Sequence, residues 1–68
     1  MPYVTLSQVI EGGKDYIRER VKDGVHPMDA LREYMDMILT IAVSGDISLF
    51  KRVKEELEEW ILRGMKDG

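Results

Sequence analysis

The chain has 68 residues and a net charge of −3, it lacks cysteine, and 34% of its residues are charged. That length allows one domain, and a single core of this size seldom supplies more than about 3–5 kcal/mol of net stability. Without cysteine there is no disulfide and no thiolate metal site, and one histidine excludes a cage of imidazoles. We therefore expect oligomerisation or a binding partner to supply further stability.

Other features of the sequence bear on location. The first residues lack the basic and apolar pattern of a signal peptide, and no segment reaches the roughly 20 apolar residues of a spanning helix. We expect no membrane association and, because cysteine is absent, a cytoplasmic protein. The sequence has no asparagine and a single glutamine beside many charges, a composition that favours a thermophile.

Residues 1–5 are predicted to form an extended arm. Pro2 lacks a backbone donor, and Tyr3 and Val4 favour strand geometry. One interpretation is a frayed terminus with Tyr3 packed on the rest of the chain. The other is an arm that adds a strand to the sheet edge of a partner. In that case Tyr3, Val4 and Leu6 are the residues predicted to dock.

A first helix is predicted over residues 6–23. Thr5 and Gln8 have the spacing of a capping box, in which each side chain bonds the backbone N–H of the other residue. The apolar residues that follow keep a helical period, and they are Leu6, Ile10, Ile17 and Val21.

The pair Gly12-Gly13 interrupts this helix at a cost of about 2 kcal/mol relative to alanine. Either the helix kinks there, or it continues because another backbone passes close to Gly13. We favour a continuous helix that ends before Gly24, since glycine suits the position just beyond a helix end.

A second helix is predicted over residues 27–43, because Pro27 suits a first helical position. Eight of the ten residues in 34–43 are apolar, so this middle helix is expected to be buried between two neighbours. Its main stripe is Met28, Leu31, Met35, Ile38 and Ala42. The methionines Met28, Met35 and Met37 either pack in the core or form an adaptable face that repacks against a partner. A second face is formed by Tyr34, Met37 and Ile41, which either pack inside the chain or contact a partner.

A third helix is predicted over residues 47–63, capped by Asp46 or Ser48 after a turn at Gly45. Its apolar stripe is Phe50, Val53, Leu57, Trp60 and Ile61. The outer face is charged, and residues four apart form the predicted ion pairs Lys51–Glu55, Lys54–Glu58 and Glu59–Arg63. Gly64 is expected to let the chain fray. Residues 1–68 are thus predicted to be a single all-α, three-helix domain.

No candidate site supports catalysis. His26 precedes Pro27 in a short turn and is expected to cap the second helix, because a metal site needs more ligands than one imidazole. Residues 55–59 hold four glutamates on a helix that also carries lysine and arginine, which favours a solvated face over a cation site. Gly12-Gly13 lacks the pattern of a phosphate-binding loop. We expect no enzyme, no metal and no cofactor.

A DNA-binding alternative rests on residues 41–54, which are similar to a helix-turn-helix with Lys51, Arg52 and Lys54 on the second helix. However, the distance from Ala42 to Gly45 is one residue short of the usual spacing. The same helix then becomes acidic, so the positive surface that supplies most affinity for phosphates is missing. Binding to nucleic acid is not expected.

In overall character the chain resembles the small inhibitors of the replication sliding clamp (PCNA) in Thermococcales archaea. The shared features are the short chain, the extended opening of residues 1–5, the absence of cysteine and asparagine, and an acidic helical remainder. The standard clamp-binding box is absent, since Gln8 is followed at the required spacing by Glu11 and no aromatic pair follows. The resemblance implies a non-catalytic inhibitor whose partner is the clamp.

We therefore expect a protein-binding regulator whose candidate contact residues are Tyr3, Val4, Leu6, Tyr34, Met37 and Ile41. The excess of apolar residues on the second helix of so short a chain is the main reason. Such a chain can be partly disordered until it is bound. The alternative is a self-associating structural or adaptor module, in which the second helix buries its outer face against a second copy.

Overall fold

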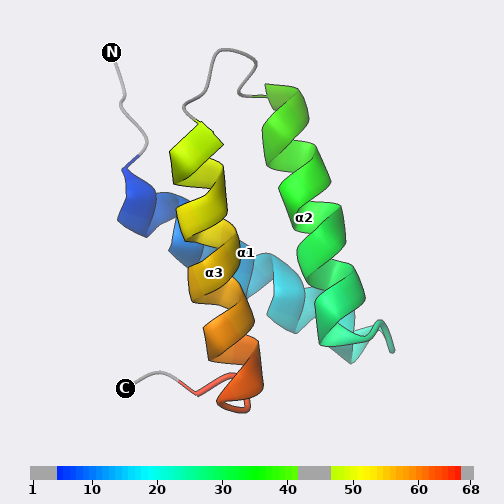
Figure 1. The fold of residues 1–68 in the computed structure, drawn as a ribbon. Coiled ribbons are helices and arrows are strands. Elements are labelled where there is room, and N and C mark those ends of the chain that lie inside the picture. Colours follow the sequence, from blue (N-terminus) through cyan, green and yellow to red (C-terminus); the bar gives the residue numbers. More distant parts are fainter. Residues whose placement is uncertain (1–4, 42–46, 67–68) are drawn as a thin grey trace.

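The computed structural model describes residues 5–41 and 47–66. They form three helices, α1 (Leu6–Lys22), α2 (Pro27–Ile41) and α3 (Ile47–Leu62), and each helix packs against the other two. Helices α2 and α3 lie side by side, and α1 crosses behind both (Figure 1). The predicted all-α, three-helix fold is confirmed. Residues 1–4 of the predicted arm and residues 42–43 of the second predicted helix lie outside the described residues.

Local hydrogen bonds start the first two helices where the sequence predicted. The Thr5 hydroxyl accepts from the Gln8 N–H at 3.1 Å, and the Thr5 N–H donates to Gln8 Oε1 at 2.9 Å. This capping box satisfies two donors at the start of α1. At the start of α2, His26 Nδ1 accepts from the Met28 N–H at 3.1 Å. His26 is therefore the exposed capping residue that was expected.

Glycines with positive φ end two helices. Helix α1 ends before Gly24 (φ 92°), as predicted. The prediction that the chain frays at Gly64 is wrong. There the Gly64 N–H donates to the Ile61 carbonyl at 2.9 Å and the Met65 N–H to the Trp60 carbonyl at 2.8 Å. This is the bond pattern of a Schellman motif, and it turns Met65 back onto the core.

All three helices contribute to the core. Its buried residues are Ile17, Ala30, Leu31, Tyr34, Val53, Leu57 and Trp60. Helix α2 reaches both neighbours, as a middle helix should, but one part of its apolar surface stays outside. Met28, Met37 and Leu39 are 38%, 41% and 52% exposed. Met28 belongs to the main apolar stripe by its helical period, but in the first turn of α2 its side chain is exposed and lies outside the buried core.

Helix α1 runs without a break through Gly12 and Gly13. The expected close approach to Gly13 exists, but side chains make it, not a backbone. A Cβ on Gly13 would lie 2.7 Å from Leu57 Cδ1 and 2.8 Å from Tyr34 Cε2. Because the glycine has no Cβ, the Tyr34 ring can lie against α1, where its hydroxyl donates to the Val9 carbonyl at 2.7 Å.

Candidate protein-binding surface

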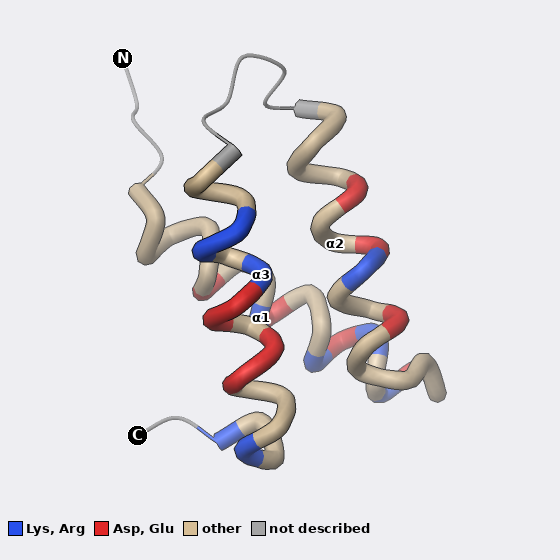
Figure 2. The backbone as a smooth tube through the Cα atoms, in the orientation of Figure 1, with Lys and Arg blue, Asp and Glu red and all other residues tan. Residues whose placement is uncertain are grey.

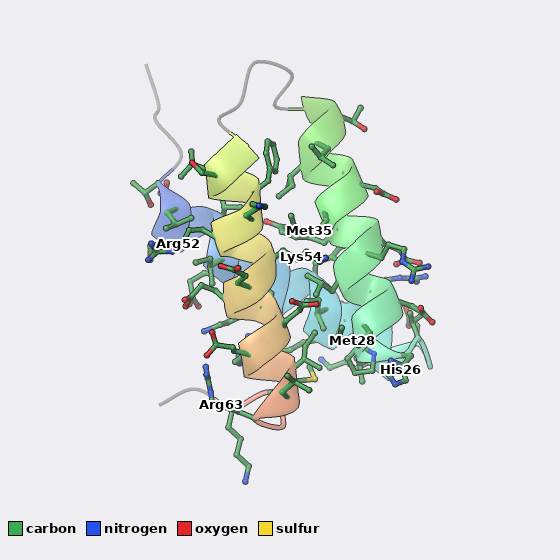
Figure 3. The ribbon with its side chains drawn as sticks, viewed as in Figure 1. His26, Met28, Met35, Arg52, Lys54 and Arg63 are labelled. Atoms are coloured by element: carbon green, nitrogen blue, oxygen red, sulfur yellow. The ribbon has the colours of Figure 1, made fainter. Side chains whose placement is uncertain are left out.

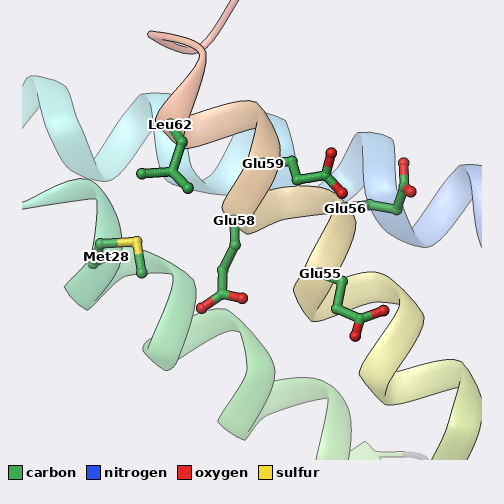
Figure 4. A pocket seen from close by; sticks show the side chains of 6 residues that line it. All are labelled: Met28, Glu55, Glu56, Glu58, Glu59 and Leu62. Atoms are coloured by element: carbon green, nitrogen blue, oxygen red, sulfur yellow. The ribbon is translucent and has the colours of Figure 1, made fainter.

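Among the described residues, the structure leaves five large apolar side chains exposed, and they are Met28, Met37, Leu39, Leu49 and Leu62. Scattered exposed apolar residues are ordinary on a soluble domain. Two of these five come together, however. Met28 on α2 and Leu62 in the last turn of α3 line one pocket, which also contains Glu55, Glu56, Glu58 and Glu59 (Figure 4). We call it the α2–α3 pocket.

The caps at the ends of the two helices position the apolar walls of the α2–α3 pocket. The bond from the Met28 N–H to His26 fixes the first turn of α2. The Schellman motif around Gly64 fixes the last turn of α3, which carries Leu62. Figure 4 shows Met28, Glu58 and Leu62 facing one another across the pocket. Leu62 is 81% exposed, so its side chain is almost fully hydrated in the isolated chain.

Two further residues lie between α2 and α3, above the pocket in the view of Figure 3. Met35 lies on the side of α2 that faces α3, and Lys54 of α3 lies opposite it (Figure 3). Met35 is half-buried against the core, whereas Lys54 is exposed. Met35, unlike Met28, therefore belongs to the edge of the core.

Charge is segregated along α3. Its first half carries Lys51, Arg52 and Lys54, and residues 55–59 are almost entirely glutamate (Figure 2). Of the three ion pairs predicted within this helix, the described residues form only Glu59–Arg63, at 3.7 Å. The predictions of Lys51–Glu55 and Lys54–Glu58 pairs are wrong. Long exposed side chains gain too little from such pairs to be held in one geometry.

The residues predicted to contact a partner lie in different environments. Tyr3 and Val4 lie outside the described residues, as does the side chain of Ile41. Leu6 is partly buried against the core, and Met37 is exposed. Tyr34 is predicted to contact a partner, but it is buried and its hydroxyl is hydrogen-bonded to Val9. It is therefore a core residue.

A polar cluster joins α1 to α2 away from the residues that line the pocket. Glu33 accepts from Arg20 Nε at 3.0 Å and from the Tyr16 hydroxyl at 3.1 Å. The hydrogen bond from Arg20, and then that from Tyr16, holds the pKa of the Glu33 carboxyl below its usual value. Burial, followed by the bond to Glu33, raises the pKa of the Tyr16 hydroxyl. The cluster orients α1 and α2 relative to each other.

A second cluster covers the only tryptophan. Trp60 is fully buried, and two cations of α1 lie over its ring, with Lys14 Nζ 5.6 Å and Arg18 Cζ 5.1 Å from the ring centroid. The indole Nε1 has no hydrogen-bond partner within the described part of the chain. The ring therefore serves packing and cation–π attraction between α1 and α3.

Residues 5–41 and 47–66 show neither a metal centre nor a membrane span. They contain no group of three or more histidine, aspartate or glutamate side chains arranged to hold a metal ion. None of the helices they form has the length and apolar character needed to cross a membrane. Comparison with protein-family models, with curated proteins and with solved structures finds no match to this chain.

Leu62 is absent from the predicted contact residues, although the sequence carries a signal for it. It continues the charged stripe of Lys51, Glu55 and Glu58 at helical spacing, so an apolar residue stands on an otherwise hydrated face. Met28 fits the period of the core stripe, so the sequence leaves open whether it packs in the core or contacts a partner. The packing of the helices leaves its side chain outside the core.

Proposed function

We propose that this chain is a non-catalytic regulator that binds a larger protein through the α2–α3 pocket. The observation that carries the proposal is the convergence of Met28 and Leu62, two exposed apolar side chains from different helices, in one pocket. A partner that covers Leu62 would remove its side chain from water, and full burial of one leucine is worth about 1.5–3 kcal/mol. A core of few buried residues leaves the isolated chain with little spare stability, so binding would also stabilise it.

The first partner to test is the archaeal sliding clamp, because the chain resembles the small clamp inhibitors of Thermococcales. On this proposal the chain binds the clamp and inhibits it without catalysis. The arm residues Tyr3 and Val4, with Leu6, would add a second contact. A Tyr3→Ala, Val4→Ala variant that binds as well as the natural chain would remove the arm from the interface.

The experiment compares two exposed leucines of the same helix. Leu62 lines the pocket, whereas Leu49 is 50% exposed in the first turn of α3, about 20 Å away along the helix. We expect Leu62→Glu to weaken binding to the clamp by at least about tenfold in a calorimetric titration. The matched variant Leu49→Glu should bind like the natural chain. Equal effects of the two substitutions would contradict a role for the pocket.

A clamp that does not bind would exclude this partner. If, in addition, dilution shifted the amide resonances of Met28 and Leu62 in the free chain, the alternative of a self-associating module would replace the regulator. A melting temperature that rises with protein concentration would also favour self-association.

A further inference from the structure

The charged residues that line the α2–α3 pocket are all acidic. Glu58 faces Met28 and Leu62, and Glu55 lies one turn away on the same side of α3 (Figure 4). Glu56 and Glu59 extend the acidic rim. The pocket thus combines two apolar side chains with four carboxylates.

This arrangement is unfavourable in the isolated chain. Glu55 and Glu58 are three residues apart and Glu55 and Glu59 are four apart, and like charges at these spacings destabilise a helix. Glu59 also lies in the last turn of α3, where the helix dipole favours cations. The described residues provide one ion pair for the four carboxylates, Glu59–Arg63 at 3.7 Å. Residues that lower the stability of their own helix, with no compensating contact inside the chain, are expected at functional sites.

We propose that the α2–α3 pocket binds a basic amphipathic segment of the partner, in which an aliphatic side chain inserts between Met28 and Leu62 while lysine or arginine side chains lie beside Glu55 and Glu58. This inference rests on the proposed function and names the chemistry of the segment that docks. Apolar anchors would supply most of the affinity, and the opposite charges would set orientation and exclude acidic competitors.

A second copy of the chain is a poor occupant for the same pocket. A two-fold contact places identical surfaces against each other. Here it would bring the four glutamates of one copy against the four of the other. Such juxtaposed like charges oppose association. The acidic rim therefore favours a cationic segment of another protein.

The test uses two synthetic helical peptides of about 15 residues with the same leucine stripe. One carries lysine at every polar position and the other carries glutamate. Each is titrated into the isotope-labelled full chain and followed by amide correlation NMR. We expect the lysine peptide to shift the resonances of Met28, Leu62 and residues 55–59, and the glutamate peptide to leave them unchanged. Raising the salt from about 0.05 M to about 0.5 M should weaken the lysine peptide severalfold.

The decisive variant is Glu55→Gln, Glu58→Gln. It should weaken the lysine peptide by about tenfold. It should also leave the melting temperature unchanged or raise it, because the repulsion between the two glutamates is relieved. The matched control, Glu19→Gln with Asp36→Asn, removes the same charge from exposed positions of α1 and α2 that do not line the pocket. The control should bind the peptide like the natural chain.

Four outcomes would overturn the inference. In the peptide titration, they are equal affinity for both peptides, binding of neither peptide, and an affinity for the lysine peptide that is unchanged by the two glutamine substitutions. The fourth is a shift of the pocket resonances when the free chain is diluted. The proposed function is judged separately by Leu62→Glu against Leu49→Glu on the protein partner. If the peptide test failed but Leu62→Glu alone weakened binding to the protein partner, the pocket would remain the binding surface and only the basic segment would be excluded.

Discussion

The hydroxyl of Tyr34 donates a 2.7 Å hydrogen bond to the main-chain carbonyl of Val9, which joins the middle of α2 to the first half of α1. The ring reaches this position over Gly12 and Gly13, where no Cβ stands in the way. One aromatic side chain thus explains why a helix retains two adjacent glycines that lower its intrinsic stability.

The hydroxyl of Tyr34 can be tested without disturbing the ring. Tyr34→Phe keeps the packing and removes the bond to Val9, so we expect a loss of about 0.5–1.5 kcal/mol in the free energy of unfolding, measured by urea denaturation. Tyr34→Ala also removes the ring and should cost about 3–5 kcal/mol. If Tyr34→Phe were as stable as the natural chain, the bond to Val9 would contribute nothing.

The two glycines should respond differently to alanine. At Gly13 the new Cβ would meet the buried side chains of Leu57 and Tyr34 at 2.7 and 2.8 Å. Overpacking of about 1–3 kcal/mol then exceeds the gain of about 1 kcal/mol in helix propensity, and Gly13→Ala should lower the melting temperature. Gly12 is exposed, and its Cβ would meet only the Tyr34 hydroxyl, at 3.3 Å. Gly12→Ala should change stability by less than about 1 kcal/mol. Equal effects at the two positions would contradict this assignment.

The cluster around Glu33 predicts a response to acid. The hydrogen bond from Arg20 lowers the pKa of Glu33 below the ordinary value of 4.5. A carboxyl whose pKa is lower in the folded than in the unfolded chain stabilises the fold above the unfolded pKa. That stability is lost as the pH falls through the folded pKa.

The test is the urea midpoint measured from about pH 7 down to about pH 3. The natural chain should lose more stability over this interval than Glu33→Gln, which cannot titrate at this position. Parallel curves for the two proteins would show that the contact between Glu33 and Arg20 does not persist in solution.

Trp60 provides an optical probe of the contact between α1 and α3. Arg18→Ala removes a cation and an aliphatic stem from the ring face, so we expect a loss of about 1 kcal/mol and a red shift of the tryptophan emission. Lys22→Ala is the control, because Lys22 is an exposed cation of α1 that pairs with Glu19 at 3.2 Å. It should leave the emission unchanged. Identical spectra for the two variants would exclude a contact of Arg18 with the indole in solution.

Local sequence was sufficient to predict the three helices and most of their ends. The reciprocal bonds of Thr5 and Gln8, the cap at His26 and the turn at Gly24 involve residues at most a few positions apart, so each is visible as a short pattern. Helical periodicity also identified Ile17, Leu57 and Trp60 as core residues, because each lies on the apolar stripe of its own helix.

Which apolar residues stay outside the core depends instead on how the helices pack. Periodicity places Met28 and Leu31 on one stripe, yet Leu31 is buried and Met28 is exposed. Likewise, Gly13 meets Leu57 and Tyr34 across helices, and Trp60 lies under Lys14 from a distant part of the chain. These contacts depend on the angles and offsets between helices. Many side chains together set that geometry, and the period of a single helix does not contain it.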